Sequence, residues 1–165
     1  MPKKALKPAD SHLRSAMGQE LHVQDVMTRD VLTVQKYDSI VSVAHMLADK
    51  NISGLPVVDR DGKLLGIITQ ADVLSMLGVG REPSFKDLLK YMLGERLPER
   101  RVGDTVGDIM TGSPATIKPE MNVADAVQLM DAKKIRRLPV VDGSGKLIGI
   151  LTRADILREV IKKLK

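Results

Sequence analysis

The chain has 165 residues, 43% hydrophobic and 28% charged, which is typical of a globular protein of two lobes or two small domains. It contains no cysteine, which excludes disulfides, thiolate nucleophiles and cysteine-ligated zinc. Aromatic residues make up only 2%, so stacking platforms for single-stranded nucleic acid are scarce. No apolar run approaches the roughly 20 residues of a membrane span, and the N-terminus lacks a signal-peptide core, so we expect a cytoplasmic protein without membrane insertion.

The net charge of +5 is carried by the two ends of the chain. Residues 1–21 and 158–165 each hold an excess of lysine and arginine, whereas basic and acidic residues balance in the body between them. Such basic ends favour solubility or a weak electrostatic contact. They also leave open a second hypothesis, a nucleic-acid-associated dimer whose tails contact phosphates, with nucleic acid as a less favoured partner.

The chain contains two copies of one segment. Val23 to Leu74 align without a gap with Val106 to Leu157, at a constant offset of 83, and 21 of these 52 positions are identical. Only two copies of so long a segment indicate a duplicated small domain and not an open array. We therefore divide the chain into a polar basic tail (1–21), a first repeat (22–77), a connecting segment (78–105) and a second repeat (106–165) with a basic helical end.

The two repeats show the same predicted elements in chain order. A short extended piece (31–34 and 115–117) precedes an amphipathic helix, which in the second copy begins at an N-cap formed by Asn122 with Asp125. Two apolar runs rich in β-branched residues follow, and the turn residues between them (59–63 and 142–146) predict a hairpin. A second helix is expected after Thr69 and after Thr152. The predicted order is therefore β-α-β-β-α.

The connecting segment contains one further predicted helix. Its apolar residues recur at helical spacing from Phe85 to Leu93, and Gly94 ends the pattern. We expect this helix to pack onto the domain or across a dimer. A mobile lid or a partner-docking helix is the alternative.

The repeated motifs, taken together, resemble a known family. Met-Thr occurs at 27–28 and 110–111, Leu-Pro-Val-Val-Asp at 55–59 and 138–142, and Gly-h-h-Thr-x-x-Asp, with h an apolar residue, at 66–72 and 149–155. This order resembles a tandem pair of cystathionine β-synthase (CBS) domains, the Bateman module, over about two-thirds of the chain. The resemblance implies an α+β fold (α/β mixed), with two β-α-β-β-α repeats packed through their sheets in pseudo-twofold symmetry, and a homodimer.

The resemblance also implies a function and its residues. Such modules bind AMP, ADP, ATP or S-adenosylmethionine in the cleft between the two repeats and signal occupancy, here to an unknown protein in trans. Asp72 and Asp155 match the family's ribose positions, with the hydroxyls of Thr69 and Thr152 nearby, and a carboxylate suits a diol because it accepts two hydrogen bonds at once. The remaining matching positions are Thr33, Val34, Gly54, Leu55, Pro56, Thr116, Ile117, Leu138 and Pro139. The spacing of the Thr-x-x-Asp pairs equally predicts helix capping, and the two roles are compatible.

The two copies differ where a phosphate group is expected. Arg136 and Arg137 precede the second Leu-Pro motif, whereas Ser53 and Gly54 precede the first. Arginine suits phosphate because its planar guanidinium donates two parallel hydrogen bonds. We therefore expect one phosphate-competent pocket at the arginines and a second pocket that is empty or prefers an uncharged adenosyl tail. Two solvated arginines at a helix end are the alternative explanation.

Residues arranged for catalysis are hard to find in this sequence. The three histidines, His12, His22 and His45, lie apart, and no Walker loop, His-Glu-x-x-His motif or obvious triad occurs. We expect no catalytic residue, no catalytic cofactor and no metal site. The third hypothesis is accordingly a purely structural dimerisation scaffold with degenerate pockets.

Overall fold

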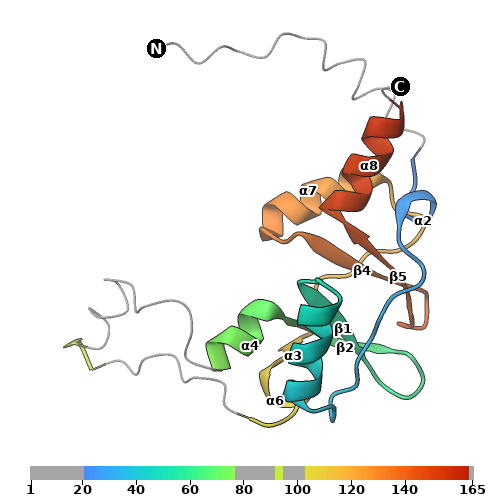
Figure 1. The fold of residues 1–165 in the computed structure, drawn as a ribbon. Helices are drawn as coiled ribbons and strands as arrows, with labels where there is room; N and C mark the ends of the chain where they lie inside the picture. The colour runs from blue at the N-terminus through green and yellow to red at the C-terminus, as the bar shows by residue number, and fades with distance from the viewer. Residues whose placement is uncertain (1–20, 77–91, 95–102, 164–165) are drawn as a thin grey trace. The chain divides into compact units, whose positions relative to one another are not determined.

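The computed structural model describes residues 21–76, 92–94 and 103–163 (Figure 1). Almost all of the basic tail and most of the connecting segment, including the start of its predicted helix, lie outside the described residues. The elements are α2 (Val23–Val26), α3 (Ile40–Asp49), β1 (Gly54–Val58), β2 (Leu64–Thr69), α4 (Gln70–Met76), α6 (Val106–Ile109), β3 (Thr111–Gly112), α7 (Val123–Lys133), β4 (Arg137–Val141), β5 (Leu147–Thr152) and α8 (Arg153–Lys163).

The chain forms two compact units whose borders differ from those of the sequence repeats. Unit 1 combines Met1–Val31 with Ala115–Lys165, and unit 2 is Leu32–Pro114. Each unit therefore contains the helices and hairpin of one repeat together with the opening segment of the other. In a simple tandem arrangement each repeat would pack with its own opening segment. Here the opening segment of each repeat, about ten residues long, belongs to the unit formed by the other repeat.

The two hairpins have the same register at the offset of the repeat. In unit 2, β1 pairs antiparallel with β2 from Gly54 opposite Thr69, and in unit 1, β4 pairs with β5 from Arg137 opposite Thr152. Both pairings carry one irregularity near the end of the first strand, and both hairpins turn within the predicted Asp-containing segments. The predicted hairpins are therefore confirmed.

The exchanged segment adds a third extended piece to each hairpin. Thr111 pairs with Ile67 on β2, and Thr28 makes the equivalent bridge to Ile150 on β5. A glycine allows this close approach, because a Cβ on Gly66 would lie 2.6 Å from the Thr111 carbonyl oxygen. The repeated Met-Thr and Gly-h-h-Thr motifs are thus the two sides of one contact.

The longer helices begin at side-chain caps that the sequence contains. Ser39 accepts a hydrogen bond from the Val41 amide at the start of α3, and Asn122 accepts one from the Ala124 amide at the start of α7. In unit 1, α8 contacts β5 and α7 contacts β4; in unit 2, α3 and α4 contact each other (Figure 1). The predicted positions of these helices are confirmed.

The opening segments contain two single-turn helices that the sequence patterns did not predict. In α6, Thr105 donates its amide and its hydroxyl to the carboxylate of Asp108; in α2, the His22 amide donates to Asp25. The extended pieces before α3 and α7 are each a single parallel bridge, Val34 to Val57 and Ile117 to Val140. The predicted first strand of each repeat is therefore reduced to one bridge.

Each unit has its own aliphatic core. Fully buried side chains from α3, the hairpin and α6 form the centre of the core in unit 2, and the equivalent elements form the centre of the core in unit 1. In unit 2 these side chains are Val43, Val57, Ile68 and Val106. In unit 1 they are Val23, Ala126, Leu138, Val140 and Leu151. Several large apolar side chains on the helices are exposed, among them Leu74, Val127 and Leu157. No helix within the described ranges is both long and apolar enough to cross a membrane.

Candidate functional site

In unit 2, Asp72 caps the first turn of α4. Its Oδ2 atom accepts hydrogen bonds from the Thr69 amide at 2.8 Å and the Thr69 hydroxyl at 3.0 Å, and the Asp72 amide returns one to that hydroxyl at 3.3 Å. Within the described residues, the second oxygen, Oδ1, accepts no hydrogen bond. The predicted capping is confirmed, and one carboxylate oxygen is left to accept a ligand hydroxyl.

In unit 1, Asp155 caps the first turn of α8 with the same geometry. Oδ2 accepts from the Thr152 amide at 2.9 Å and the Thr152 hydroxyl at 2.8 Å. The environment of Oδ1 differs, because the Thr28 hydroxyl donates to it at 3.3 Å and the guanidinium of Arg158 pairs with it. Asp155 is 6% exposed and is the only buried charged residue in the part of the chain that the structure describes.

The structure places the predicted site residues of each repeat along the first strand of its hairpin and at the open end of that hairpin. Val34 hydrogen-bonds the backbone on either side of Val57, which places Thr33 beside β1, and the Gln70 amide donates to the Ser53 carbonyl at 3.0 Å. Gly54 lies opposite Thr69 in the ladder. In unit 1, Ile117 and Thr116 lie beside β4 in the same way, and the Arg153 amide donates to the Arg136 carbonyl at 3.1 Å.

Several predicted site residues are part of the hydrophobic cores. The side chains of Val34, Leu55, Ile117 and Leu138 are all buried, and both prolines, Pro56 and Pro139, are buried as well. These residues fix the position of the extended piece beside the hairpin. Their side chains can form the floor of a slot for a base, while the backbone and Thr33 or Thr116 supply its polar edge.

Arg136 and Arg137 lie at the start of β4, on the same hairpin end as Asp155. Arg136 is exposed and Arg137 is half-buried. Burial lowers the pKa of the Arg137 guanidinium from its ordinary value, and the charge of Arg136 lowers it further. A cation that is disfavoured by desolvation and by a like charge gains from an anion beside it. This pair is therefore suited to a phosphate group, whereas unit 2 carries Ser53 and Gly54 there.

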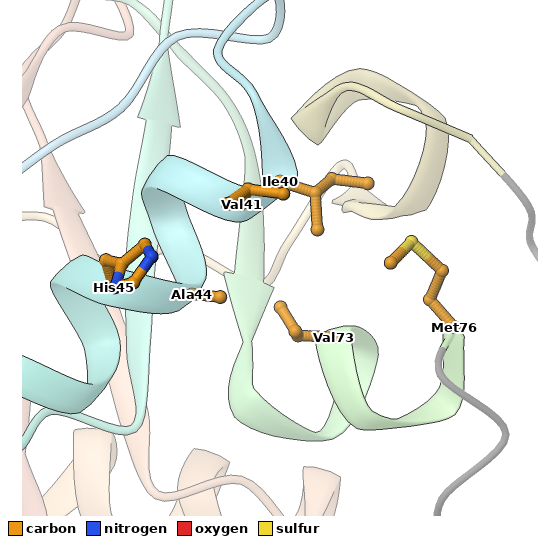
Figure 2. Close-up of a pocket in the computed structure, with 6 residues that line it drawn as sticks. All are labelled: Ile40, Val41, Ala44, His45, Val73 and Met76. Atoms are coloured by element: carbon orange, nitrogen blue, oxygen red, sulfur yellow. The ribbon is translucent and has the colours of Figure 1, made fainter.

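A separate apolar hollow of about 270 Å³ lies between α3 and α4 of unit 2 (Figure 2). Its walls come from Ile40, Val41, Ala44 and His45 on α3 and from Val73 and Met76 on α4. A site for a nucleotide needs a few convergent polar groups, and this hollow has one histidine as its polar side chain. It is therefore a different feature from the capping carboxylate of Asp72.

Two residues around Asp155 were missed in the sequence: Thr28 and Arg158. Arg158 could have been found, because it lies one helical turn after Asp155, whereas the first repeat has Ser75 there. Thr28 could not, because its contact with Asp155 depends on the exchange of the opening segments between the repeats.

The model of the CBS domain family matches residues 23–78 and 106–162. The two matches cover more than half of the chain and coincide with the two repeats, so the chain belongs to the CBS domain family as a tandem pair. The protein MJ1426 of Methanocaldococcus jannaschii is similar to it, with 33% identity over 158 residues, which covers 87% of this chain and 94% of that protein.

A CBS domain-containing protein of Arabidopsis thaliana, the chloroplastic CBSX2, is also similar, at 34% identity over 151 residues. The chain spans 63% of the length of CBSX2. The crystal structure of CBSX2 in complex with AMP matches with a TM-score of 0.70 and covers 87% of this chain and 98% of that one. The CBS pair of MJ0100, in complex with 5′-methylthioadenosine and S-adenosylmethionine, matches at 29% identity with a TM-score of 0.63, covering 84% and 98%. The predicted family and the mixed α+β fold class are confirmed.

Proposed function

We propose that this protein is a non-catalytic regulatory module that binds an adenosine-containing ligand at the capping carboxylates of its CBS repeats. The observation that carries the proposal is the likeness to CBSX2, which was crystallised with AMP and matches most of this chain at 34% identity. The likeness to MJ0100, crystallised with 5′-methylthioadenosine and S-adenosylmethionine, supports the same class of ligand.

The geometry of the two aspartates supports ligand binding. Both carboxylates already accept hydrogen bonds from the amide and the hydroxyl of a threonine at the start of a helix, which fixes their position. At Asp72 the second oxygen, Oδ1, remains as an acceptor for a ribose hydroxyl. The positions next to the Leu-Pro motifs then distinguish ligands with a phosphate group from ligands without one. Arg136 and Arg137 are suited to the phosphate groups of AMP, ADP or ATP.

Signalling requires a surface that reports occupancy. The exposed apolar side chains Val41, Leu74, Leu157 and Ile161 lie on helices of both units, and pairing of such faces in a homodimer is the arrangement we propose. A ligand that binds one arrangement more tightly than another shifts the population, and a protein in trans reads the shift. Cytoplasmic location stays a prediction, since CBSX2 is named as chloroplastic.

The test is thermal unfolding of the purified full chain with AMP, ADP, ATP, S-adenosylmethionine and 5′-methylthioadenosine, alongside guanosine monophosphate as a control. A ligand at 100 times its Kd adds about 2.7 kcal/mol to the free energy of unfolding. We expect stabilisation by at least one adenosine compound and none by the guanosine control. A folded protein that no adenosine compound stabilises would contradict the proposal.

A further inference from the structure

The carboxylate of Asp155 has no unused acceptor position. A carboxylate offers about four lone-pair sites, two on each oxygen. Oδ2 uses its two for the amide and hydroxyl of Thr152, and Oδ1 accepts from the Thr28 hydroxyl and from the Arg158 guanidinium. A ligand hydroxyl can reach this carboxylate only if one of these donors leaves.

The carboxylate of Asp72, in contrast, has unused acceptor positions. Oδ2 accepts from the amide and hydroxyl of Thr69, as in the other repeat, while Oδ1 accepts no hydrogen bond within the described residues. The position one helical turn later is Ser75, which is exposed and makes no hydrogen bond to Asp72 in the part of the chain described. Asp72 is also half-buried, whereas Asp155 is buried.

Arg158 is the donor that can leave most readily. Its side chain is 68% exposed, so water replaces its partner when it moves away. The Thr152 donors, in contrast, are part of the helix cap. The Thr28 hydroxyl is neutral and donates at the long distance of 3.3 Å, so it holds Oδ1 less strongly than a guanidinium does.

We propose that Arg158 competes with the ligand for Asp155, so that the second repeat binds the ribose of an adenosine compound more weakly than the Asp72 site does. This inference rests on the proposed function and adds to it a residue that sets the relative affinity of the two sites. An ion pair with one exposed partner contributes a modest free energy, which corresponds to about a twofold to fivefold change in Kd at Asp155.

The experiment is isothermal titration calorimetry of the full chain with adenosine, which carries no phosphate. Asp72→Ala isolates the Asp155 site, and Arg158→Ser is then added, because serine is the residue of the first repeat at this position. Lys162→Ser is the matched control, since Lys162 lies one turn further along α8, carries the same charge and pairs with Glu159 and not with Asp155. Circular dichroism confirms that each variant is folded.

We expect Arg158→Ser to tighten adenosine binding about twofold to fivefold and Lys162→Ser to leave it unchanged. Raising the salt concentration from about 0.05 M to about 0.5 M should tighten adenosine binding to the arginine-containing site and have less effect on the serine variant, because salt screens the competing ion pair. The reciprocal change, Ser75→Arg with Asp155→Ala, should weaken binding at Asp72.

Two results would overturn this inference, and they differ from failure of the proposed function. Unchanged or weaker adenosine binding in Arg158→Ser, while the parent Asp72→Ala protein still binds, shows that Arg158 does not compete and removes the inference alone. No heat of binding from adenosine in the wild type or in any folded variant removes the inference. It removes the proposed function as well only when none of AMP, ADP, ATP, S-adenosylmethionine and 5′-methylthioadenosine stabilises the protein against thermal unfolding.

Discussion

The two units share a backbone plan but differ around one carboxylate. Their hairpins pair in the same register at the offset of the repeat, and Asp72 and Asp155 cap the following helices through the same atoms of a threonine. Only Asp155 is also held by Arg158 and Thr28. The two repeats therefore share one scaffold, and the difference in side chain between Ser75 and Arg158 contributes to making the two carboxylates chemically different.

A second difference lies at the position proposed for a phosphate group. Unit 1 carries Arg136 and Arg137 where unit 2 carries Ser53 and Gly54. Under the proposed function, unit 1 combines an arginine pair suited to phosphate with an occupied carboxylate at Asp155. Unit 2 combines an open carboxylate at Asp72 with no cation at these two positions. This contrast predicts that neutral and phosphorylated adenosine compounds prefer different repeats.

Gly66→Ala tests the contact between the hairpin and the opening segment, which occurs once within each unit. This substitution should have the largest effect on the free energy of unfolding. The added Cβ would lie 2.6 Å from the backbone oxygen of Thr111, so β3 has to move, at a cost of about 2–3 kcal/mol in unfolding free energy. Gly149→Ala should cost less, because its nearest backbone atom lies at 3.0 Å and its closest neighbour is a methionine side chain. Urea unfolding measures both.

Gly143→Ala is the control for these two variants, since no atom lies within 4 Å of the position that an added Cβ would occupy in the turn. We expect its unfolding midpoint to be near that of the wild type. Equal destabilisation by all three glycine substitutions would contradict the role assigned to the exchanged strand.

Arg137→Ala tests the contrast at the phosphate position. Loss of a hydrogen bond to a charged group should weaken AMP binding about tenfold. Adenosine binding should change little, because adenosine has no phosphate. Lys133→Ala, on the neighbouring helix α7, is the charge-matched control, and calorimetry with both ligands gives the comparison. Equal loss of AMP and adenosine binding would remove the assignment of Arg137 to phosphate.

Alanine at the two aspartates separates stability from binding. Asp155→Ala should lower the unfolding free energy by about 2 kcal/mol and Asp72→Ala by about 1 kcal/mol, since both remove a helix cap but only Asp155 also binds Thr28 and is buried. Adenosine binding should show the opposite order, with the greater loss at Asp72. Denaturant unfolding and calorimetry on the same samples measure the two losses. If the same variant lost more of both stability and adenosine binding, the prediction would be contradicted.

Ser144→Ala should have the smallest effect on the free energy of unfolding, present at neutral pH and lost at low pH. The Ser144 hydroxyl is the main cause that lowers the pKa of Asp142 in the turn of unit 1, aided by backbone amides and Lys146. A lowered carboxyl pKa stabilises the folded protein above the unfolded-state pKa, and this contribution is lost as the pH falls through the lowered value. The variant should raise the Asp142 pKa in an NMR titration; no change would contradict the assignment.

The sequence predicted most of the fold because its signals are local. The Asp-Gly turns, the β-branched runs and the Asn122 cap place the hairpins and helices correctly, and the repeated Thr-x-x-Asp spacing predicts both capped aspartates. The single-turn helices were missed because four residues show no periodicity. Their Thr105-Asp108 cap was the available signal.

The exchange of opening segments could not be predicted from the repeat alone. Met27-Thr28 is as compatible with the hairpin of its own repeat as with that of the other, because the two hairpins are nearly identical in sequence. The choice depends on chain connectivity and packing, which no local pattern records. For the same reason, the sequence did not predict that all acceptor positions of the Asp155 carboxylate are used, since Thr28 is distant from Asp155 in the sequence.

The most direct test of the central claim is an NMR titration of the ¹⁵N-labelled full chain with adenosine, following the amides of Thr69–Asp72 and Thr152–Asp155. We predict that the Thr69–Asp72 signals shift at lower adenosine concentration than the Thr152–Asp155 signals. Shifts at Thr152–Asp155 first, at both sites with one Kd, or at neither site would contradict an adenosine-binding pair with unequal sites.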